Sequence, residues 1–183
     1  LVTLAVSDGF DPDELYQAGM EVVTAATVRN HPSAISPRIK SMNYLNNILA
    51  KIEAIDAGVL EAVMINPQGY VAECTGDNIC VLQELRGQMR LLSPPLHAGC
   101  LGGVTLDTVM QLADELGVPA HRSDLTKHDL YTADEMFLTG TAAEIMPVTK
   151  IDGRTIGNGE PGPWTRKLSQ AFRNYVQQQC PED

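Results

Sequence analysis

The spacing of apolar side chains along the chain predicts three helices. Between residues 42 and 57 apolar residues recur every three or four positions, and a glycine follows as a stop signal. The same spacing recurs after the Gly102-Gly103 pair and ends at Gly117. A third helix is expected to begin at Pro163, because proline lacks the N–H that the first turn of a helix leaves unpaired.

Strand patterns fill the regions between these helices. β-Branched residues favour a strand over residues 20–27, and apolar runs at 62–65 and 70–72 flank a turn that ends at Gly69. Asp152-Gly153 turns a last hairpin. Further strands are predicted at residues 78–82, 89–92, 136–138 and 145–148. Such β-rich blocks, interrupted by three helices, indicate an α/β or α+β domain.

The first residues resemble the middle of a larger protein. The chain begins without Met on an apolar, strand-like run at residues 1–6, which lacks the basic region and cleavage site of a signal peptide. A polar, turn-rich stretch follows at residues 7–13 and is the best linker candidate. We therefore expect the chain to be the C-terminal part of a longer protein.

Composition and charge exclude several classes of function. The 183 residues carry 13 Lys and Arg against 23 Asp and Glu, a formal net charge of −10, and 44% of them are hydrophobic. That apolar share is enough for a core and excludes a disordered chain. The acidic balance argues against nucleic acids and anionic membranes as partners. No apolar run approaches the roughly 18 residues of a membrane-spanning helix, so we expect a soluble protein.

Cysteine and histidine spacing predicts no metal site. The four cysteines lack the paired short spacing of structural zinc sites, and the four histidines are scattered. Buried, reduced thiols are expected at the cysteines, which are Cys74, Cys80, Cys100 and Cys180. This cysteine usage fits a reducing compartment, and we expect a cytoplasmic location.

Three turns rich in small residues offer backbone amides to an anion. They lie at residues 73–78, 101–105 and 139–143. Each is weak evidence alone, because a Gly-Gly pair is more often a tight turn and an isolated Lys such as Lys40 is usually a surface residue. In combination, a Lys, the Glu73 carboxylate on a β scaffold and two phosphate-type turns are the groups that a pyridoxal phosphate site requires.

Five segments resemble, in order, the motifs of the class IV (fold-type IV) aminotransferases, which depend on pyridoxal 5′-phosphate. Residues 38–51 are similar to the family's lysine segment, 69–78 to its second motif and 101–105 to its phosphate turn. Residues 137–148 are similar to its last site segment, and 157–163 to the loop before its final helix. Branched-chain amino acid aminotransferase is the subfamily that the chain resembles most.

The resemblance implies a fold and a domain boundary. We expect residues 18–183 to form the family's large C-terminal, cofactor-binding domain, a β-rich pseudo-barrel with flanking helices. Residues 1–17 would be the end of a truncated small N-terminal domain and the linker between the two. In relatives the small domain supplies an Arg to the phosphate and much of the substrate pocket. Cys74 departs from the family, since relatives usually have a small residue there, beside the cofactor.

The resemblance also implies roles for individual residues. Lys40 would form the Schiff base with the cofactor aldehyde and, once freed by substrate, move the proton between Cα and C4′. Glu73 would keep the pyridine nitrogen protonated, and Tyr44 would donate a hydrogen bond to the phenolate oxygen. The phosphate would be held by Val104, Thr105 and Thr141, and the substrate carboxylate by the amides of Thr141, Ala142 and Ala143.

The implied reaction is transamination of Leu, Ile and Val with 2-oxoglutarate as amino acceptor, carried out by a homodimer. D-Amino acid aminotransferase and aminodeoxychorismate lyase share the scaffold and stay open as alternatives, although Tyr44 and the Gly162-Pro163 pair favour the branched-chain type. An isolated domain without activity is a further alternative. A sugar- or nucleotide-binding module would explain neither Lys40 nor Glu73.

Overall fold

The structure is a computed structural model that describes residues 12–179, so the apolar run at residues 1–6 and most of the expected linker lie outside it. The helices are α1 (Pro12–Ala18), α2 (Leu45–Asp56), α3 (Val104–Glu115), α4 (Lys127–Tyr131) and α5 (Pro163–Gln179), with a 3₁₀ turn η1 (Leu96–Ala98). The strands are β1 (Met20–Thr24), β2 (Glu61–Ile65), β3 (Val71–Cys74), β4 (Asn78–Leu85), β5 (Gln88–Ser93), β6 (Ala120–Arg122), β7 (Glu135–Gly140), β8 (Glu144–Ile151) and β9 (Arg154–Thr155).

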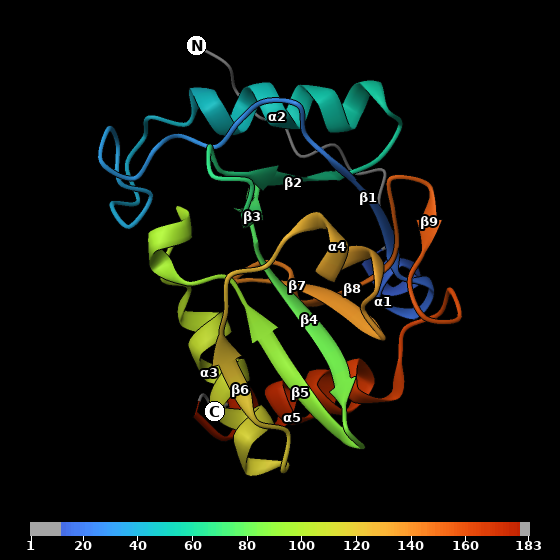
Figure 1. Cartoon of the computed structure of the whole chain (residues 1–183). Coiled ribbons are helices and arrows are strands. Elements are labelled where there is room, and N and C mark those ends of the chain that lie inside the picture. Colours follow the sequence, from blue (N-terminus) through green and yellow to red (C-terminus); the bar gives the residue numbers. More distant parts are fainter. Residues whose placement is uncertain (1–11, 180–183) are drawn as a thin grey trace.

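These strands form one mixed, curled sheet (Figure 1). The strand order is β3-β2-β1-β8-β7-β4-β5-β6, and β9 pairs with β8. β1 is parallel to both of its neighbours, while the middle of the sheet from β8 to β5 is antiparallel. The edge strand β3 is followed, after only three residues, by β4 in the middle of the sheet. The sheet must therefore curl, because a flat sheet would hold these two strands too far apart.

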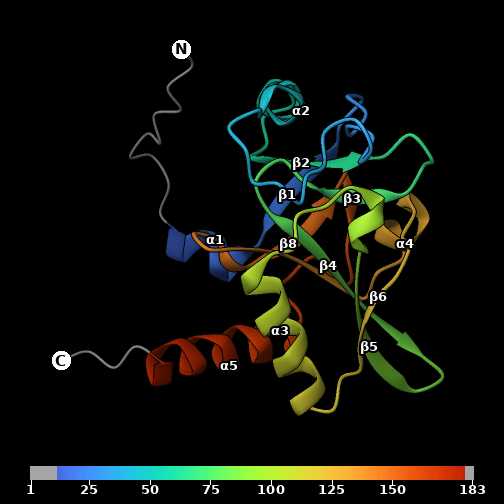
Figure 2. The same cartoon turned by 90° about the vertical axis from the view of Figure 1, so that its left-hand side faces the viewer.

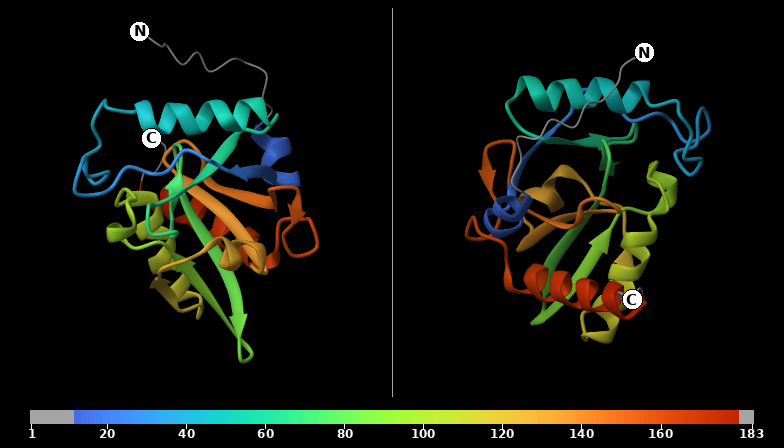
Figure 3. Two further views of the ribbon diagram at one scale, coloured as in Figure 1. Left: turned by 45° about the horizontal axis from the view of Figure 1, so that its top comes forward. Right: turned by 180° about the vertical axis from the view of Figure 1, so that it is seen from behind.

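Alternation along the strands sends side chains into two cores. Ile79 and Val81 of β4 point into a core inside the curl, whereas Cys80 and Leu82 pack towards α3 and α5. Figures 2 and 3 show α3 and α5 side by side at the end of the molecule opposite to α2. The expectation of a β-rich, curled sheet with flanking helices is confirmed.

Helix α2 packs through its small residues. Ala50 and Ala54 are fully buried against β1 and β2. Of the five large aliphatic residues that produce the predicted periodicity, Ile48 is half-buried. The other four are 46–64% exposed, and they are Leu45, Leu49, Ile52 and Ile55. The predicted helix is confirmed, but within the described part of the chain its apolar stripe faces outwards.

The three predicted helices are present, and the two short helices α1 and α4 were not predicted. α1 covers the end of the segment that we expected to be the linker and the end of the small domain. The domain boundary between residues 17 and 18 stays a prediction. α4 begins with a capping box in which Thr126 and Asp129 exchange hydrogen bonds. The strand expected at residues 20–27 ends at Thr24, and the helix expected from residue 42 begins at Leu45.

Within residues 12–179, no helix combines the length and the apolar character needed to span a bilayer.

Candidate functional site

A cavity of about 350 Å³ opens beside the first turn of α3. Four segments that are distant in sequence line it: the loop before α2, the turn after β3, the residues before α3 and the end of β7. Figure 1 shows the loop before α2 and the segment around η1 on the same side of the molecule. The cavity brings together five of the residues expected at a cofactor site, namely Lys40, Glu73, Val104, Thr105 and Thr141.

The Glu73 carboxylate is buried in the cavity wall and well supplied with hydrogen bonds. Its Oε1 forms an ion pair with the guanidinium of Arg29. Its Oε2 accepts hydrogen bonds from the backbone N–H of Leu101 (2.8 Å) and from Nδ2 of Asn78 (3.2 Å). Burial raises the pKa of Glu73 above its ordinary value, while Arg29, Leu101 and Lys40 act in the opposite direction. These contacts fix the orientation of the carboxylate.

Arg29, the ion-pair partner of Glu73, was not singled out in the sequence. It follows β1 and is 5% exposed. Its Nε donates to the carbonyl of Gly99 (3.0 Å), and its Nη1 donates to Oδ1 of Asn47 (2.8 Å). A buried guanidinium requires such partners, because an unpaired charge in the interior is costly. Arg29 therefore joins Glu73 to α2 and to the segment that precedes α3.

Lys40 lies in a non-helical loop before α2. Its side chain is exposed and makes no hydrogen bond or ion pair with the part of the chain that the structure describes. The charge of Lys40 lowers the pKa of both Glu73 and Asp77, so the ammonium is close to both carboxylates. Tyr44 lines a smaller pocket of about 40 Å³ that shares Lys40 and Glu73 with the larger cavity. The amine is thus accessible to a ligand in either space.

Polar side chains pack directly on two glycines at the other end of the cavity. A Cβ on Gly103 would overlap Oδ1 of Asn78, and a Cβ on Gly140 would overlap Oδ1 of Asp77. Gly103 has an extended backbone at the start of α3, where no side chain of the described residues caps the first turn. The first amides of α3 are therefore available to an anion.

Thr139 adds an unexpected polar group to this wall. It is 1% exposed, it lines the cavity, and its hydroxyl has no hydrogen-bond partner within residues 12–179. Thr139 pairs across the β4–β7 ladder with Asn78, so both side chains lie on the cavity face of the sheet. Buried hydroxyls normally find a partner, and an orphan at a cavity wall is consistent with a polar ligand.

The predicted substrate-carboxylate segment forms the hairpin turn between β7 and β8. Thr141 lines the cavity, whereas Ala142 and Ala143 are not among its lining residues. The carbonyl of Ala143 accepts a hydrogen bond from the Tyr16 hydroxyl (3.0 Å), which fastens the turn to α1. Their role towards a substrate carboxylate stays a prediction.

A second buried carboxylate, which no pattern in the sequence had indicated, holds the turn between β3 and β4. Glu61 is 4% exposed and accepts hydrogen bonds from the backbone N–H of Thr75 (3.0 Å) and of Gly76 (3.3 Å). The Nζ of Lys51 lies 3.9 Å from the same carboxylate. Because Thr75 and Gly76 lie between Glu73 and the start of β4, Glu61 fixes the turn that forms one wall of the cavity.

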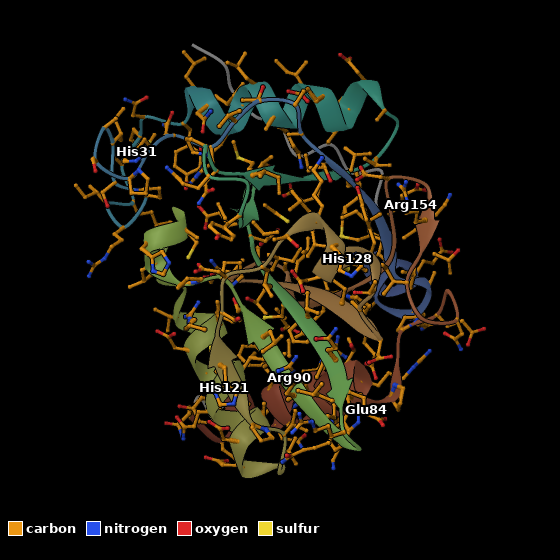
Figure 4. The ribbon with its side chains drawn as sticks, in the orientation of Figure 1. His31, Glu84, Arg90, His121, His128 and Arg154 are labelled. Atoms are coloured by element: carbon orange, nitrogen blue, oxygen red, sulfur yellow. The ribbon has the colours of Figure 1, made fainter. Side chains whose placement is uncertain are left out.

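Among residues 12–179, no cysteine or histidine lines the cavity. Cys74 packs into the core inside the curl, and burial raises the pKa of its thiol well above the ordinary value. Cys80 and Cys100 are also buried and free, and Cys180 lies outside the described residues. Figure 4 shows His31, His121 and His128 far apart on different elements. Among residues 12–179, no three His, Cys, Asp or Glu side chains are grouped as metal ligands.

Comparison with known proteins identifies related sequences and folds. The family described as amino-transferase class IV matches residues 2–151. The branched-chain-amino-acid aminotransferase of Pseudomonas aeruginosa is 40% identical over 165 residues, which cover 90% of this chain and 52% of that protein. The chain thus spans about half the length of the curated relatives it matches.

Solved structures agree with these sequence matches. The branched-chain amino acid aminotransferase of Thermobaculum terrenum in its PLP form has a TM-score of 0.84 and 35% identity, over 93% of this chain and 54% of that one. The branched-chain amino acid aminotransferase of Escherichia coli has a TM-score of 0.83 and 34% identity, over 87% and 53%. On the strength of the sequence match and the shared fold, the chain belongs to the class IV aminotransferase family.

Proposed function

We propose that the cavity holds pyridoxal 5′-phosphate and that the complete protein transfers amino groups from Leu, Ile and Val to 2-oxoglutarate. The observation that carries this proposal is the meeting, in one cavity, of the Lys40 amine, the fixed Glu73 carboxylate and two turns that offer amides and hydroxyls. The chain spans about half the length of its relatives, so the substrates and the activity are proposed for the whole protein.

The residues around the cavity suit this cofactor. Its volume of about 350 Å³ is in the range of small-molecule sites. Within the described part of the chain, no side chain caps the first amides of α3 and no group bonds to the buried hydroxyl of Thr139. The amides suit a phosphate, and the hydroxyl suits a polar ligand. Glu73 suits a protonated ring nitrogen, and Lys40 suits an aldehyde. The cavity therefore offers complementary groups for the phosphate, the ring nitrogen and the aldehyde of the cofactor.

We assign the proton transfer to Lys40. The cofactor, when bound, supplies an electron-withdrawing ring that acidifies the Cα proton of the amino acid. The Lys40 amine, released by the incoming amino group, would take that proton and deliver it to C4′. Glu73 would accept a hydrogen bond from the ring nitrogen and keep its proton in place, with Arg29 and Asn78 holding the carboxylate. Tyr44, in the adjoining pocket, would donate to the phenolate oxygen.

The phosphate would bind at the turns beside α3 and β7. The amides of Val104 and Thr105, together with the hydroxyls of Thr105 and Thr141, are the donors proposed for it. The amides of Thr141, Ala142 and Ala143 are proposed for the substrate carboxylate, since they follow β7 at the edge of the cavity.

Ligands seen in related branched-chain amino acid aminotransferases support the proposed cofactor and substrate class. One such enzyme has been solved with pyridoxamine 5′-phosphate, with N-(5′-phosphopyridoxyl)-L-glutamate and with 4-methylvaleric acid, and the Thermoproteus uzoniensis enzyme with norvaline. We also propose a homodimer for the whole protein, because the exposed aliphatic stripe of α2 is the kind of surface that another chain or domain covers. A cytoplasmic location stays a prediction.

The decisive experiment is chemical trapping of the lysine. The chain is mixed with pyridoxal 5′-phosphate, an absorbance spectrum is recorded, and borohydride reduction is followed by peptide mass mapping. We expect a visible absorbance band and a reduced label on Lys40, both lost in Lys40→Ala and kept in Lys127→Ala. A label on another residue contradicts the proposal. So does the absence of a label on Lys40 in a longer protein that also contains the part its relatives have and this chain does not. In that longer protein, turnover of Leu but not of D-alanine separates the branched-chain type from the D-amino acid type.

A further inference from the structure

Asp77 places a carboxylate at the amide-rich end of the cavity. It lies in the turn before β4 and is partly buried. The pairing of Asn78 with Thr139 brings Asp77 opposite Gly140, and the absence of a Cβ on Gly140 leaves room for the Asp77 oxygen. Gly140 immediately precedes Thr141, which lines the same cavity. The carboxylate therefore stands beside the place assigned to the phosphate.

Asp77 differs from the other acidic residues here because its charge is not compensated by direct contacts. Glu73 is paired with Arg29, and Glu61 accepts hydrogen bonds from Thr75 and Gly76. The Asp77 carboxylate has no hydrogen bond or ion pair within the described part of the chain. Its charge is therefore available to act on whatever ligand enters the cavity.

The charged groups around Asp77 come from four elements. Glu61 on β2 raises its pKa in addition to the larger effect of burial, and Lys51 on α2 and Lys40 in the preceding loop lower it. The thiol of Cys74 on β3 is a further neighbour, whose own pKa Asp77 raises. The balance raises the pKa of Asp77 to about 6, so the carboxyl changes charge near neutral pH.

A phosphate and an ionised carboxylate at the same end of a partly enclosed cavity repel each other, because the protein interior screens charge poorly. Protonation of the carboxyl removes that repulsion and turns Asp77 from an anion into a hydrogen-bond donor. An anion that binds here would consequently favour the protonated form of Asp77, and by linkage acid would favour binding.

We propose that binding of a tetrahedral anion between the start of α3 and Thr141 is coupled to uptake of a proton by Asp77. This inference rests on the proposed function, because it takes the phosphate to lie at these two turns. The protonation state of Asp77 would then determine how strongly this end of the cavity binds an anion. The cofactor would then bind more tightly as the pH falls through the range in which Asp77 titrates.

Sulfate is a suitable probe, because it keeps the same double negative charge from pH 5 to pH 8 and has the shape of a phosphate. Backbone amide NMR spectra of the chain are recorded during sulfate titrations at both pH values. In the unmodified chain we expect affinity at pH 5 to exceed that at pH 8 by about tenfold, with shifts at Val104, Thr105 and Thr141. The Asp77→Asn variant should bind sulfate tightly at both pH values. Asp56→Asn, at the exposed end of α2, is the matched control and should behave like the unmodified chain.

Three results would overturn the inference. They are equal pH dependence in Asp77→Asn and the unmodified chain, no strengthening of binding by Asp77→Asn at pH 8, and absence of sulfate-induced shifts at these amides in both proteins. The amide spectrum itself reports whether each variant is folded. Failure of the proposed function is seen separately, as absence of the Lys40 label in the trapping experiment, which does not depend on sulfate.

Discussion

The guanidinium of Arg29 and the carboxylate of Glu73 form a buried ion pair beside the cavity, with 5% and 9% of their side chains exposed. The pair links the loop after β1 to the end of β3. Its partners also reach α2 through Asn47 and the segment before α3 through Leu101. The carboxylate proposed to face the ring nitrogen is therefore part of a network that joins three walls of the site.

Loss of Arg29 is expected to destabilise the fold strongly. Arg29→Met leaves Glu73 buried without a counter-charge, which should lower the free energy of unfolding by about 3–5 kcal/mol. The loss should be smaller at acidic pH, because protonation of Glu73 removes the unpaired charge. Urea unfolding at pH 5 and pH 8 measures both effects.

Two further variants separate charge pairing from general damage. Arg29→Met combined with Glu73→Gln should recover part of the lost stability, since no unpaired charge remains. Arg173→Met removes an exposed pair with Glu144 (3.3 Å) and should cost at most about 1 kcal/mol. A double variant less stable than Arg29→Met would contradict this account of the pair.

Gly103→Ala tests the close packing at the start of α3. The new Cβ would overlap Oδ1 of Asn78, so Asn78 must move and lose its bonds to Glu73 and Leu101. We expect a loss of about 1–3 kcal/mol in the free energy of unfolding, measured by urea denaturation. Gly102→Ala is the matched control, because its Cβ would come no closer than 3.7 Å to the Leu96 side chain. Similar losses of unfolding free energy in both variants would mean that the backbone conformation of this segment, and not the displacement of Asn78, causes the loss.

Local patterns in the sequence predicted much of the fold but not what its faces contact. α3 begins after a Gly-Gly pair and ends near Gly117, and the β2–β3 hairpin has its turn residues between two apolar runs, so both were predictable. The periodicity of α2 predicted a helix. It did not predict that the aliphatic stripe would face outwards, because periodicity defines a face and not its neighbour.

The site was predictable only where residues belong to a recognisable motif. Lys40, Glu73 and the two turns were found through their resemblance to a family, and the cavity brings them together. Arg29 is 44 residues from Glu73 in the sequence, and no local pattern links a lone Arg to a distant carboxylate. Glu61 likewise looks like an ordinary strand residue, and only its burial reveals that it holds the Thr75 turn.

Thr139→Val is expected to change stability and cofactor affinity in opposite directions. In the free chain the substitution removes a buried hydroxyl that has no hydrogen-bond partner among the described residues, so the free energy of unfolding should stay equal or rise by about 1 kcal/mol. If the hydroxyl meets the bound cofactor, affinity for pyridoxal 5′-phosphate should fall roughly fivefold. Urea unfolding and absorbance titration measure the two quantities. Thr139→Ser, which keeps the hydroxyl, should restore affinity, and equal affinity in all three proteins would remove Thr139 from the site.

Asp77 should make the fold less stable as the pH rises. Its pKa is about 6 in the folded chain against an ordinary value of 3.8, so the folded state holds the proton more tightly than the unfolded state does. Its contribution to stability is therefore fully present below pH 3.8 and is lost as the pH rises through 6. With partial exposure taken into account, Asp77→Asn should raise the free energy of unfolding by about 1–2 kcal/mol at pH 8. At pH 4, where Asp77 is protonated in the folded chain, the two proteins should differ little in urea unfolding. A gain of equal size at both pH values would show that Asn packs better for reasons unrelated to charge, and a loss at pH 8 would mean that the ionised carboxylate has a stabilising partner.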